Sequence, residues 1–304
     1  MSSYRFCRTD DIQLLVDALN RCWSPYFSEE PPTTPAAFKR SIRDLQVWCS
    51  SCMVAFSGSD PIGVLIGAKR PSGTLIHKIA VHPDHRRQGH ARHLLTSLSS
   101  KLAILGPPRI VAEVPETNAE ACALFTASGY AEEAVLTDYV ADVGPNFRLR
   151  QGYGGLAEAS AEAVSSAAPQ SADNDAGRFV IPITVDDLAA NDLLKPVPQM
   201  CWERAVETLT ARKDDVAGFA VASDERIEAY LLYVQGGEIV SLCTVVEDGG
   251  ARLKQLLAPL SAQGMRVFRF PKVHTSEISQ ELLETLGFRP AGTHRLYATR
   301  ARSA

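Results

Sequence analysis

A short apolar strand, a basic turn and a helix follow one another between Ile76 and Leu95, and this segment constrains the fold more than any other. Residues 76–81 form a mostly apolar run that is typical of a buried strand. Pro83 ends the run, because proline has no amide hydrogen to give to a neighbouring strand. From Gly89 onward, apolar residues recur at spacings of three and four, which predicts an amphipathic helix.

The joint between this strand and this helix predicts an anion-binding site. The first amides of a helix lack acceptors within the helix, and the helix dipole places partial positive charge beside them. Gly89 has no side chain to keep a phosphate away from the backbone, and Arg86, Arg87 and Arg92 add positive charge nearby. The arrangement suits a pyrophosphate. The alternative is a solvated, basic start of a buried helix.

Length, charge and cysteine usage exclude several classes of protein. The 304 residues are enough for two domains with cores of their own. A net charge of −4 gives no overall attraction to nucleic acid or to an anionic membrane, so we expect neither as a partner. Apolar runs are too short to span a membrane, and the N-terminus lacks the apolar core of a signal peptide. Seven scattered cysteines favour a reducing compartment, so we expect a cytoplasmic protein.

Two groups of residues hint at a metal site, but neither has the partners that such a site needs. Cys49 and Cys52 form a C-x-x-C pair, whereas a zinc site requires a second ligand pair at suitable spacing. Five of the seven histidines fall between His77 and His93, spread over strand, turn and helix without a grouped thiol or carboxylate. We therefore expect no bound metal.

The first half alternates strands and helices in the manner of an α/β (α+β) fold. Caps, turn signals and apolar periodicity predict helices at residues 11–22, 34–44, 89–105 and 117–128. They predict strands at residues 4–8, 51–56, 62–68, 76–81, 109–114, 133–137 and 138–143. The basic turn thus lies near the middle of this half.

The turn Arg-Arg-Gln-Gly-His-Ala at residues 86–91 fits the Arg/Gln-x-x-Gly-x-Gly/Ala signature of GNAT-type N-acyltransferases, and the order of elements is similar to that family's. The resemblance implies a mixed, mostly antiparallel, twisted sheet flanked by helices, with acetyl-CoA as cosubstrate. It implies that the backbone of Ile79, Ala80 and Val81 polarises the thioester carbonyl. The residues that it places around the pyrophosphate are Arg86, Arg87, Gln88, Gly89, His90, Ala91 and Arg92.

A second motif supports the resemblance. The helix that begins at Asn118 and ends at Gly129-Tyr130 resembles the family's Asn-x-x-Ala-x-x-Leu-Tyr-x-x-x-Gly-Phe helix, in which the asparagine contacts the pantetheine arm. The alternative for Asn118 is a helix cap alone. Phe125 replaces the tyrosine that often protonates the departing thiolate. Either the thiolate leaves unprotonated, or another donor such as Tyr130 or Tyr139 serves.

Glu113 is the candidate general base. Between Ile79 and Asn118 the spacing resembles that of ribosomal-protein alanine N-acetyltransferases, which implies a base at this position. An alkylammonium cannot attack a thioester until it loses a proton, and a neighbouring carboxylate can take that proton directly or through water. The alternative is an outward-facing strand residue, since alternation around Glu113 does not reveal its face.

The second half is predicted to repeat the first. Residues 151–178 form an Ala/Ser/Gly-rich linker in which residues 157–168 could form a weak helix. Residues 179–304 then repeat the order of elements of residues 1–150, which predicts two tandem GNAT-like domains. At the turn that corresponds to the basic one, Glu247 and Asp248 replace the arginines and would repel a pyrophosphate. We expect this degenerate half to shape the acceptor site or to form a dimer-like interface, in a monomer or a homodimer.

These features predict an acetyl-CoA-dependent N-acetyltransferase that transfers its acetyl group directly to a primary amine in a ternary complex. A peptide N-terminus, a lysine side chain and a small-molecule amine all remain open as acceptors. The alternative is a non-catalytic acyl-CoA-binding or regulatory module, which Phe125 favours because it has no proton to give.

Overall fold

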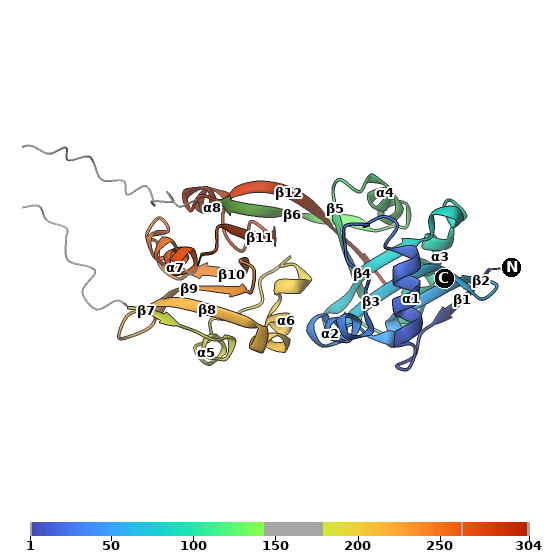
Figure 1. Cartoon of the computed structure of the whole chain (residues 1–304), viewed down its shortest axis with the longest axis horizontal. Helices are drawn as coiled ribbons and strands as arrows, with labels where there is room; N and C mark the ends of the chain where they lie inside the picture. Colours follow the sequence, from blue (N-terminus) through green and yellow to red (C-terminus); the bar gives the residue numbers. More distant parts are fainter. Residues whose placement is uncertain (1, 143–178, 263, 303–304) are drawn as a thin grey trace, which may run out of the picture.

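The computed structural model describes residues 2–142, 179–262 and 264–302 and contains one twelve-stranded sheet flanked by helices (Figure 1). This architecture confirms the predicted α/β class. The predicted linker and its weak helix lie outside the described residues. In the first half, the main elements are β1 (Ser2–Phe6), α1 (Ile12–Cys22), α2 (Pro35–Leu45), β2 (Met53–Ser57), β3 (Asp60–Arg70), β4 (Gly73–Val81), α3 (His90–Leu105), β5 (Arg109–Pro115), α4 (Ala119–Ala127) and β6 (Ala131–Asp142).

The second half follows the same order of strands and helices. Its elements are β7 (Phe179–Pro182), α5 (Val185–Ala190), α6 (Val206–Ala211), β8 (Val216–Ala222), β9 (Ile227–Val234), β10 (Glu238–Thr244), α7 (Ala251–Ala262), β11 (Val267–Val273), α8 (Gln280–Thr285) and β12 (Arg289–Arg300). Short 3-10 turns add η1 (Cys49–Ser51), η2 (Pro83–His85), η3 (Trp202–Arg204) and η4 (Lys213–Asp215). The repeat in the sequence is therefore a repeat of structure.

The end of the first half differs from the prediction of two short strands at residues 133–137 and 138–143. Residues 131–142 form the single strand β6. It stays extended because it has partners along its whole length: β12 on one edge, and β11 on the other from Thr137 to Asp142. The two predicted strands follow each other directly at Thr137 and Asp138, with no glycine or proline between them to form a turn, so the chain need not reverse there.

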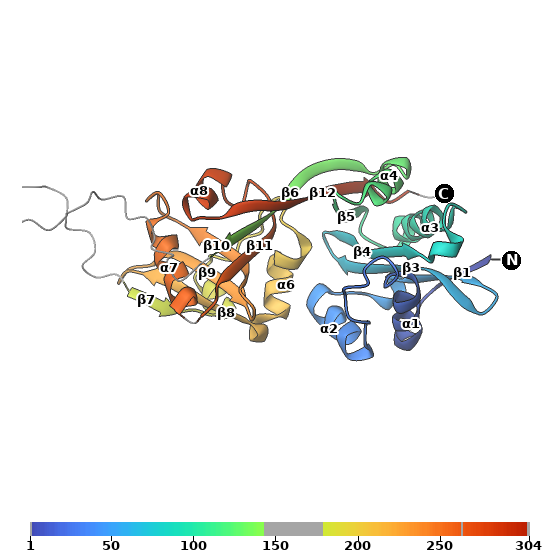
Figure 2. The same ribbon diagram turned by 45° about the horizontal axis from the view of Figure 1, so that its top comes forward.

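The two halves exchange their last strands. The sheet order is β1-β2-β3-β4-β5-β12-β6-β11-β10-β9-β8-β7, so β12 of the second half lies between β5 and β6 of the first. Leu296 on β12 pairs with Glu113 on β5 and with Ala134 on β6. Figures 1 and 2 show β6 and β12 side by side, joining the two lobes. Each half therefore completes its sheet with a strand from the other.

Two parallel strand pairs splay apart at equivalent places. β4 and β5 pair only at Thr74 with Ile110 and at Leu75 with Val111. β10 and β11 pair only at Glu238 with Arg269. Beyond these points the facing edges of the two strands are not paired with each other, so the sheet of each half has a gap there.

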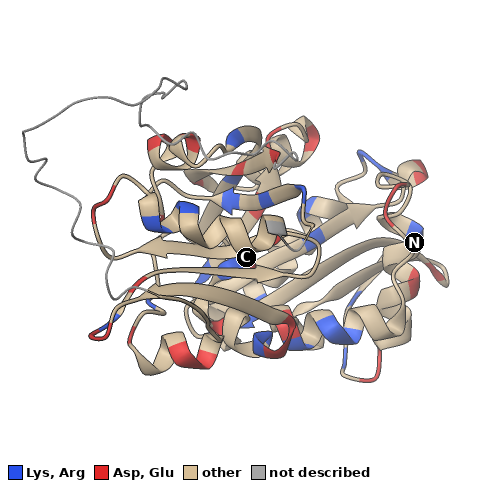
Figure 3. Cartoon of the chain, turned by 60° about the vertical axis from the view of Figure 1, so that its left-hand side comes forward, with Lys and Arg blue, Asp and Glu red and all other residues tan. Residues whose placement is uncertain are grey.

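The apolar residues of each half are buried on both faces of the sheet. In the first half, one core packs under α1 and α2 and includes Leu15, Leu19 and Ile66, and the other packs under α3 and α4. In the second half, one core packs under α7 and α8 and another under α5 and α6. Figure 3 shows acidic and basic residues interspersed along the elements, in keeping with the small net charge of −4. Among the described helices, none has the length and apolar character to cross a membrane.

Candidate active site

The basic turn positions an open helix start. Gly89 caps the N-terminus of α3 with a φ of +85°, a left-handed conformation that favours glycine. A Cβ built on Gly89 would meet no atom within 4 Å, so the space in front of the backbone is free. Arg87 also has a positive φ, of 60°. The turn thus presents the first amides of α3 to solvent, as anion binding requires.

The arginines of the turn contact the start of α4. Arg86 forms an ion pair with Glu120 and lies with its guanidinium carbon 5.5 Å from the Tyr26 ring centroid. Arg87 Nη2 lies 3.6 Å from Glu120 Oε1. Gln88 and Arg92 are exposed and Ala91 is half-buried, beside the turn and on the first turn of α3. Because ion pairs between accessible side chains contribute only about 0–1 kcal/mol, an arriving phosphate can recruit these arginines.

The side chain of His90 points away from the predicted phosphate site. His90 is buried, and its Nδ1 lies 2.6 Å from the hydroxyl of Tyr4 on β1. Burial lowers the pKa of this imidazole, so it is neutral at neutral pH. Only the backbone amide of His90 can therefore contribute to the predicted site.

The predicted carbonyl-binding stretch lies at the edge of the gap between β4 and β5. Ile79, Ala80 and Val81 pair with β3 on their other edge. The Tyr26 hydroxyl donates to the Val81 carbonyl at 2.7 Å and fixes the end of the strand. Ile66 of β3 pairs with Lys78 and Gly67 pairs with Ile76, so His77 has no partner on β3. β4 therefore has a bulge at His77, just after the point where it leaves β5.

Asn118 is a helix cap, which was the alternative to its role at the pantetheine arm. Its Oδ1 accepts from the Ala121 amide at 3.0 Å, at the N-terminus of α4. This contact uses one acceptor only, and the exposed side chain also carries two amide donors. The pantetheine contact stays a prediction.

Phe125 and the candidate proton donors lie in apolar cores. Phe125 is buried, with ring centroids 5.1 Å from Tyr130 and 5.8 Å from Tyr297 of β12. Burial raises the pKa of Tyr130 far above its usual value. Tyr139 is buried in the core under α7, in the second half. The sequence did not predict a role for Tyr297, because only the strand exchange brings it to α4. There its hydroxyl forms hydrogen bonds with the side chains of Cys122 and Thr126.

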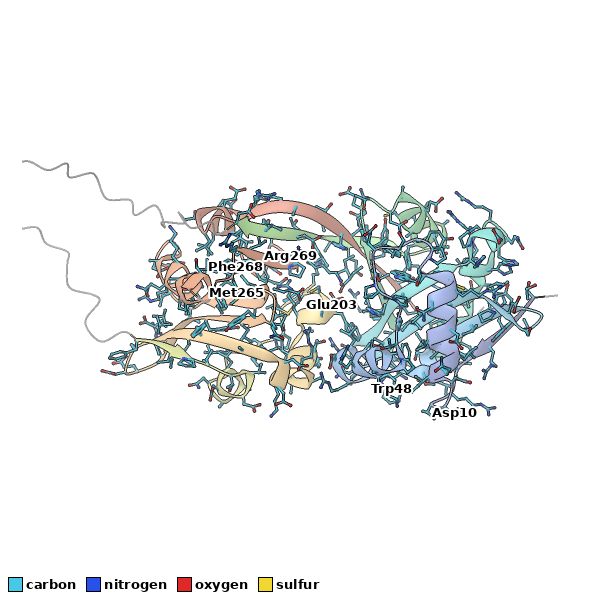
Figure 4. The ribbon with its side chains drawn as sticks, viewed as in Figure 1. Asp10, Trp48, Glu203, Met265, Phe268 and Arg269 are labelled. Atoms are coloured by element: carbon cyan, nitrogen blue, oxygen red, sulfur yellow. The ribbon has the colours of Figure 1, made fainter. Side chains whose placement is uncertain are left out.

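Glu113 is buried at the junction of the two halves rather than facing outward. Its side chain is 5 % exposed. Oε1 accepts from the backbone amide of Trp202 at 2.7 Å, and Oε2 lies 3.0 Å from Lys272 Nζ. Lys272 Nζ also lies 2.5 Å from Glu203 Oε2, and Figure 4 shows Glu203 where the second half faces the first. Sequence reasoning missed Lys272, Glu203 and Trp202.

The resulting cluster has two carboxylates and one ammonium group. Burial lowers the pKa of Lys272, but the carboxylates of Glu113 and Glu203 outweigh it and raise that pKa well above its usual value. Burial likewise opposes ionisation of Glu203, yet the Lys272 ammonium lowers its pKa overall. Lys272 has a φ of +52°, and its amide donates to Asp138 Oδ1 at 2.9 Å. By formal charge, two carboxylates and one ammonium group carry one net negative charge, which favours a further cation nearby.

His77 adds a neutral base beside this cluster. It occupies the bulge of β4, and burial lowers its pKa to about 4, with Glu203 as the main opposing influence. The imidazole is therefore uncharged at neutral pH and has a free nitrogen lone pair. The bulge, which sequence patterns do not show, is what sets His77 apart from the other histidines.

Glu113, Cys201 and Glu203 bring three ligand-type atoms within 4.8 Å of one another. A thiol must lose its proton to bind a metal, but burial raises the pKa of Cys201 to about 12. The Lys272 ammonium already contacts both carboxylates. These contacts describe an ion-pair cluster with its own cation.

In the second half, a carboxylate of the chain itself occupies the helix start that is open in the first half. At the start of α7, the Asp248 carboxylate accepts from the amides of Gly250 and Arg252, each at 2.9 Å. Burial alone would raise the pKa of Asp248, but the hydrogen bonds from these amides and from Arg252 lower it overall. Arg252 also pairs with Asp248 at 2.7 Å and with Glu228 at 2.7 Å. The Asp248 carboxylate thus occupies two amides at this helix start, and its charge would repel a pyrophosphate there.

Comparison with known proteins identifies the fold. The sequence model of the acetyltransferase (GNAT) family matches residues 12–130. A tandem GNAT protein from the clavulanic acid biosynthesis pathway, solved without acetyl-CoA, is similar over 100 % of both chains, with a TM-score of 0.62 and 15 % identity. A GCN5-related N-acetyltransferase from Sphaerobacter thermophilus is similar over 99 % of this chain and 96 % of its own, with a TM-score of 0.64 and 13 % identity. A GCN5-related N-acetyltransferase from Anabaena variabilis is similar over 99 % and 73 %, with a TM-score of 0.60 and 11 % identity. At such identities, the structures show a shared fold.

Proposed function

Residues 12–130 belong to the acetyltransferase (GNAT) family within a tandem GNAT fold, and from this premise we propose that the protein transfers an acetyl group from acetyl-CoA to a primary amine. The contrast between the two halves carries the proposal. The helix start at Gly89 is open, whereas Asp248 fills the equivalent start in the second half. The fold does not need the basic turn, so the turn is present for a ligand.

The gap between β4 and β5 gives that ligand a path to the reacting site. A pyrophosphate at Gly89 would lie at the N-terminus of α3, and the acyl arm would run along the free edge of β4 towards the bulge at His77. Backbone amides on this edge would polarise the thioester carbonyl and stabilise negative charge on its oxygen during attack. Asn118, at the start of α4, would contact the arm through its amide group.

The buried cluster would receive the acceptor amine. Its net negative charge attracts an alkylammonium, and Glu113 would take the proton that the amine must lose. Lys272 does not prevent this, because it keeps Glu203 as a second carboxylate partner when Glu113 releases it. The amine nitrogen then bonds to the carbonyl carbon and gives up its second proton to water, the carbon–sulfur bond breaks, and CoA leaves as a thiolate. A free thiol has a pKa of about 8.5, so the thiolate can take its proton from water without a tyrosine at position 125.

The test is Glu113→Gln, which keeps the shape and removes the base. We expect turnover to fall by about 10²–10⁴-fold with acetyl-CoA affinity unchanged. Glu116→Gln is the matched control, since that carboxylate follows the same strand but is 47 % exposed and pairs with Arg295. Unchanged turnover and an unchanged pH profile in Glu113→Gln would exclude Glu113 as the base. If acetyl-CoA binds but no amine releases CoA, the chain is an acyl-CoA-binding module instead.

A further inference from the structure

The second half contains a cavity in the gap between β10 and β11, the equivalent of the proposed acyl site. Its volume is about 230 Å³. Ser241, Leu242 and Cys243 of β10 line one wall, and Phe270 of β11 lines another. The wall away from the sheet comes from residues 192–200 and from α6. The second half thus has a partly open cavity at this position, although Glu247 and Asp248 stand in its turn where the first half has arginines.

A buried, incompletely bonded arginine lines this cavity. Arg204 is 2 % exposed, and its Nη1 has no hydrogen-bond partner among the described residues. The other nitrogens are engaged: Nε with Cys201 Sγ at 3.2 Å, and Nη2 with the Lys272 carbonyl and with Glu277 Oε1, both at 2.7 Å. The guanidinium also lies 4.7 Å from the Phe270 ring centroid. A buried N–H without a partner is costly, so a ligand that supplies an acceptor there is favoured.

The charges around the cavity select a neutral ligand. Arg204 is paired with Glu277, whose side chain is 6 % exposed. At the rim, Lys195 Nζ lies 3.0 Å from Asp192 Oδ2. These are the four charged residues of the lining, and their formal charges cancel. A carboxylate would enter close to Glu277 without a spare cation, and an ammonium would face the guanidinium.

The rest of the lining is apolar and sets the size and character of the ligand. Leucine, valine, methionine and aromatic side chains make up most of it, among them Leu193, Val197, Met200 and Leu209. At about 30 Å³ for each water-sized unit, the cavity holds roughly seven or eight such units. An amide or ester with a chain of about six carbons matches this space.

We propose that the cavity between β10 and β11 is a binding site for a small, neutral, largely apolar molecule whose carbonyl oxygen accepts a hydrogen bond from Arg204 Nη1. The site is independent of acetyl transfer in the first half. Arg204 also holds the backbone of Lys272, whose side chain contacts Glu113, so the two sites share one structural neighbour.

Three probes of equal chain length test the proposal: hexanamide, hexanoate and hexylammonium. Ligand-observed NMR titrations of the full chain should show saturable binding of hexanamide and at least tenfold weaker binding of the two charged probes. Cys243→Phe fills the cavity, leaves Arg204 itself unchanged, and should abolish hexanamide binding. Val180→Phe, on the exposed edge strand β7, is the matched control and should leave binding unchanged.

A crystal of the full chain soaked in hexanamide gives the second readout, which needs no variant. The carbonyl oxygen should lie within hydrogen-bond distance of Arg204 Nη1. A water molecule on Nη1 with no amide in the cavity would overturn the proposal. Equal binding of all three probes by the unaltered chain, or full hexanamide binding by a folded Cys243→Phe variant, would also overturn it.

Discussion

The ammonium of Lys272 lies 3.0 Å from Oε2 of Glu113, although 159 positions separate the two residues in the chain. The contact joins β11 of the second half to β5 of the first. The second half therefore contributes directly to the surroundings of the candidate base, even though its own turn carries Glu247 and Asp248 instead of arginines. The following predictions depend on this junction and on the strand exchange behind it.

Removal of the Lys272 charge should destabilise the chain. Lys272→Met leaves the carboxylates of Glu113 and Glu203 close together without their shared cation, in a site where Lys272 is only 18 % exposed. Breaking a buried pair in this way costs about 3 kcal/mol or more. Urea unfolding of the full chain measures the loss. Lys195→Met is the control, because that lysine is 67 % exposed and its ion pair should contribute less than about 1 kcal/mol. Equal effects of the two variants would contradict the predicted role of the cluster.

Negative charge at the basic turn should weaken acetyl-CoA binding. Gly89→Asp places a carboxylate where a pyrophosphate would approach, and we expect at least tenfold weaker affinity by calorimetry. Gly89→Ala introduces the same left-handed strain without charge and should weaken binding much less. Gly58→Asp is a second control, since Gly58 also has a positive φ, of 61°, and open space around it, but lies in the β2–β3 turn. If Gly89→Asp, Gly89→Ala and Gly58→Asp all bind acetyl-CoA equally well, the basic turn is not the acetyl-CoA site.

His77 should make the folded chain less stable in acid. Burial lowers its folded pKa to about 4, whereas an unfolded histidine titrates near 6.5. Below about pH 6.5 the unfolded chain therefore binds a proton that the folded chain does not, and stability falls until the pH reaches about 4. The full contribution is roughly 3 kcal/mol. Unfolding free energies at pH 7.0, 5.5 and 4.5 should decline less steeply in His77→Gln, and parallel curves for the two proteins would contradict the assignment.

Loss of β12 should leave the first half incomplete. A chain that ends at residue 150 exposes both the edge of β5 and the edge of β6 that β12 normally covers. Such unpaired edges associate readily. We expect a lower unfolding midpoint and association in light scattering, both reversed by a peptide of residues 287–302. A monomer with the midpoint of the full chain would show that β12 is dispensable.

The sequence predicted the order of elements well, because local signals set it. Thr34 caps α2 through the Ala37 amide, with Pro35 at its first position, and Gly89 begins α3, as the patterns predicted. The strand exchange has no local signal, because β5 and β12 lie far apart in the chain. The alternation of side chains along β5 would suit β6 or β12 as its neighbour equally well.

The same reason explains which site residues were missed. The basic turn is one continuous segment, so its residues are visible together in the sequence. Lys272, Glu203 and Trp202 reach Glu113 only through tertiary structure. Lys272 follows Pro271 in a segment that carries no motif. The burial of His90 and the placement of Tyr297 beside Phe125 also depend on neighbours from distant strands.

The most direct test of the central claim is to incubate the full chain with acetyl-CoA and a panel of primary amines, and to measure released CoA and acetylated amine together. The panel contains peptides with free N-termini, lysine side chains in blocked peptides and small-molecule amines. The account predicts at least one amine that gains one acetyl group on nitrogen for each CoA released, and predicts that Glu113→Gln greatly slows this reaction. Tight binding of acetyl-CoA with no CoA release above that of buffer for any amine would contradict it.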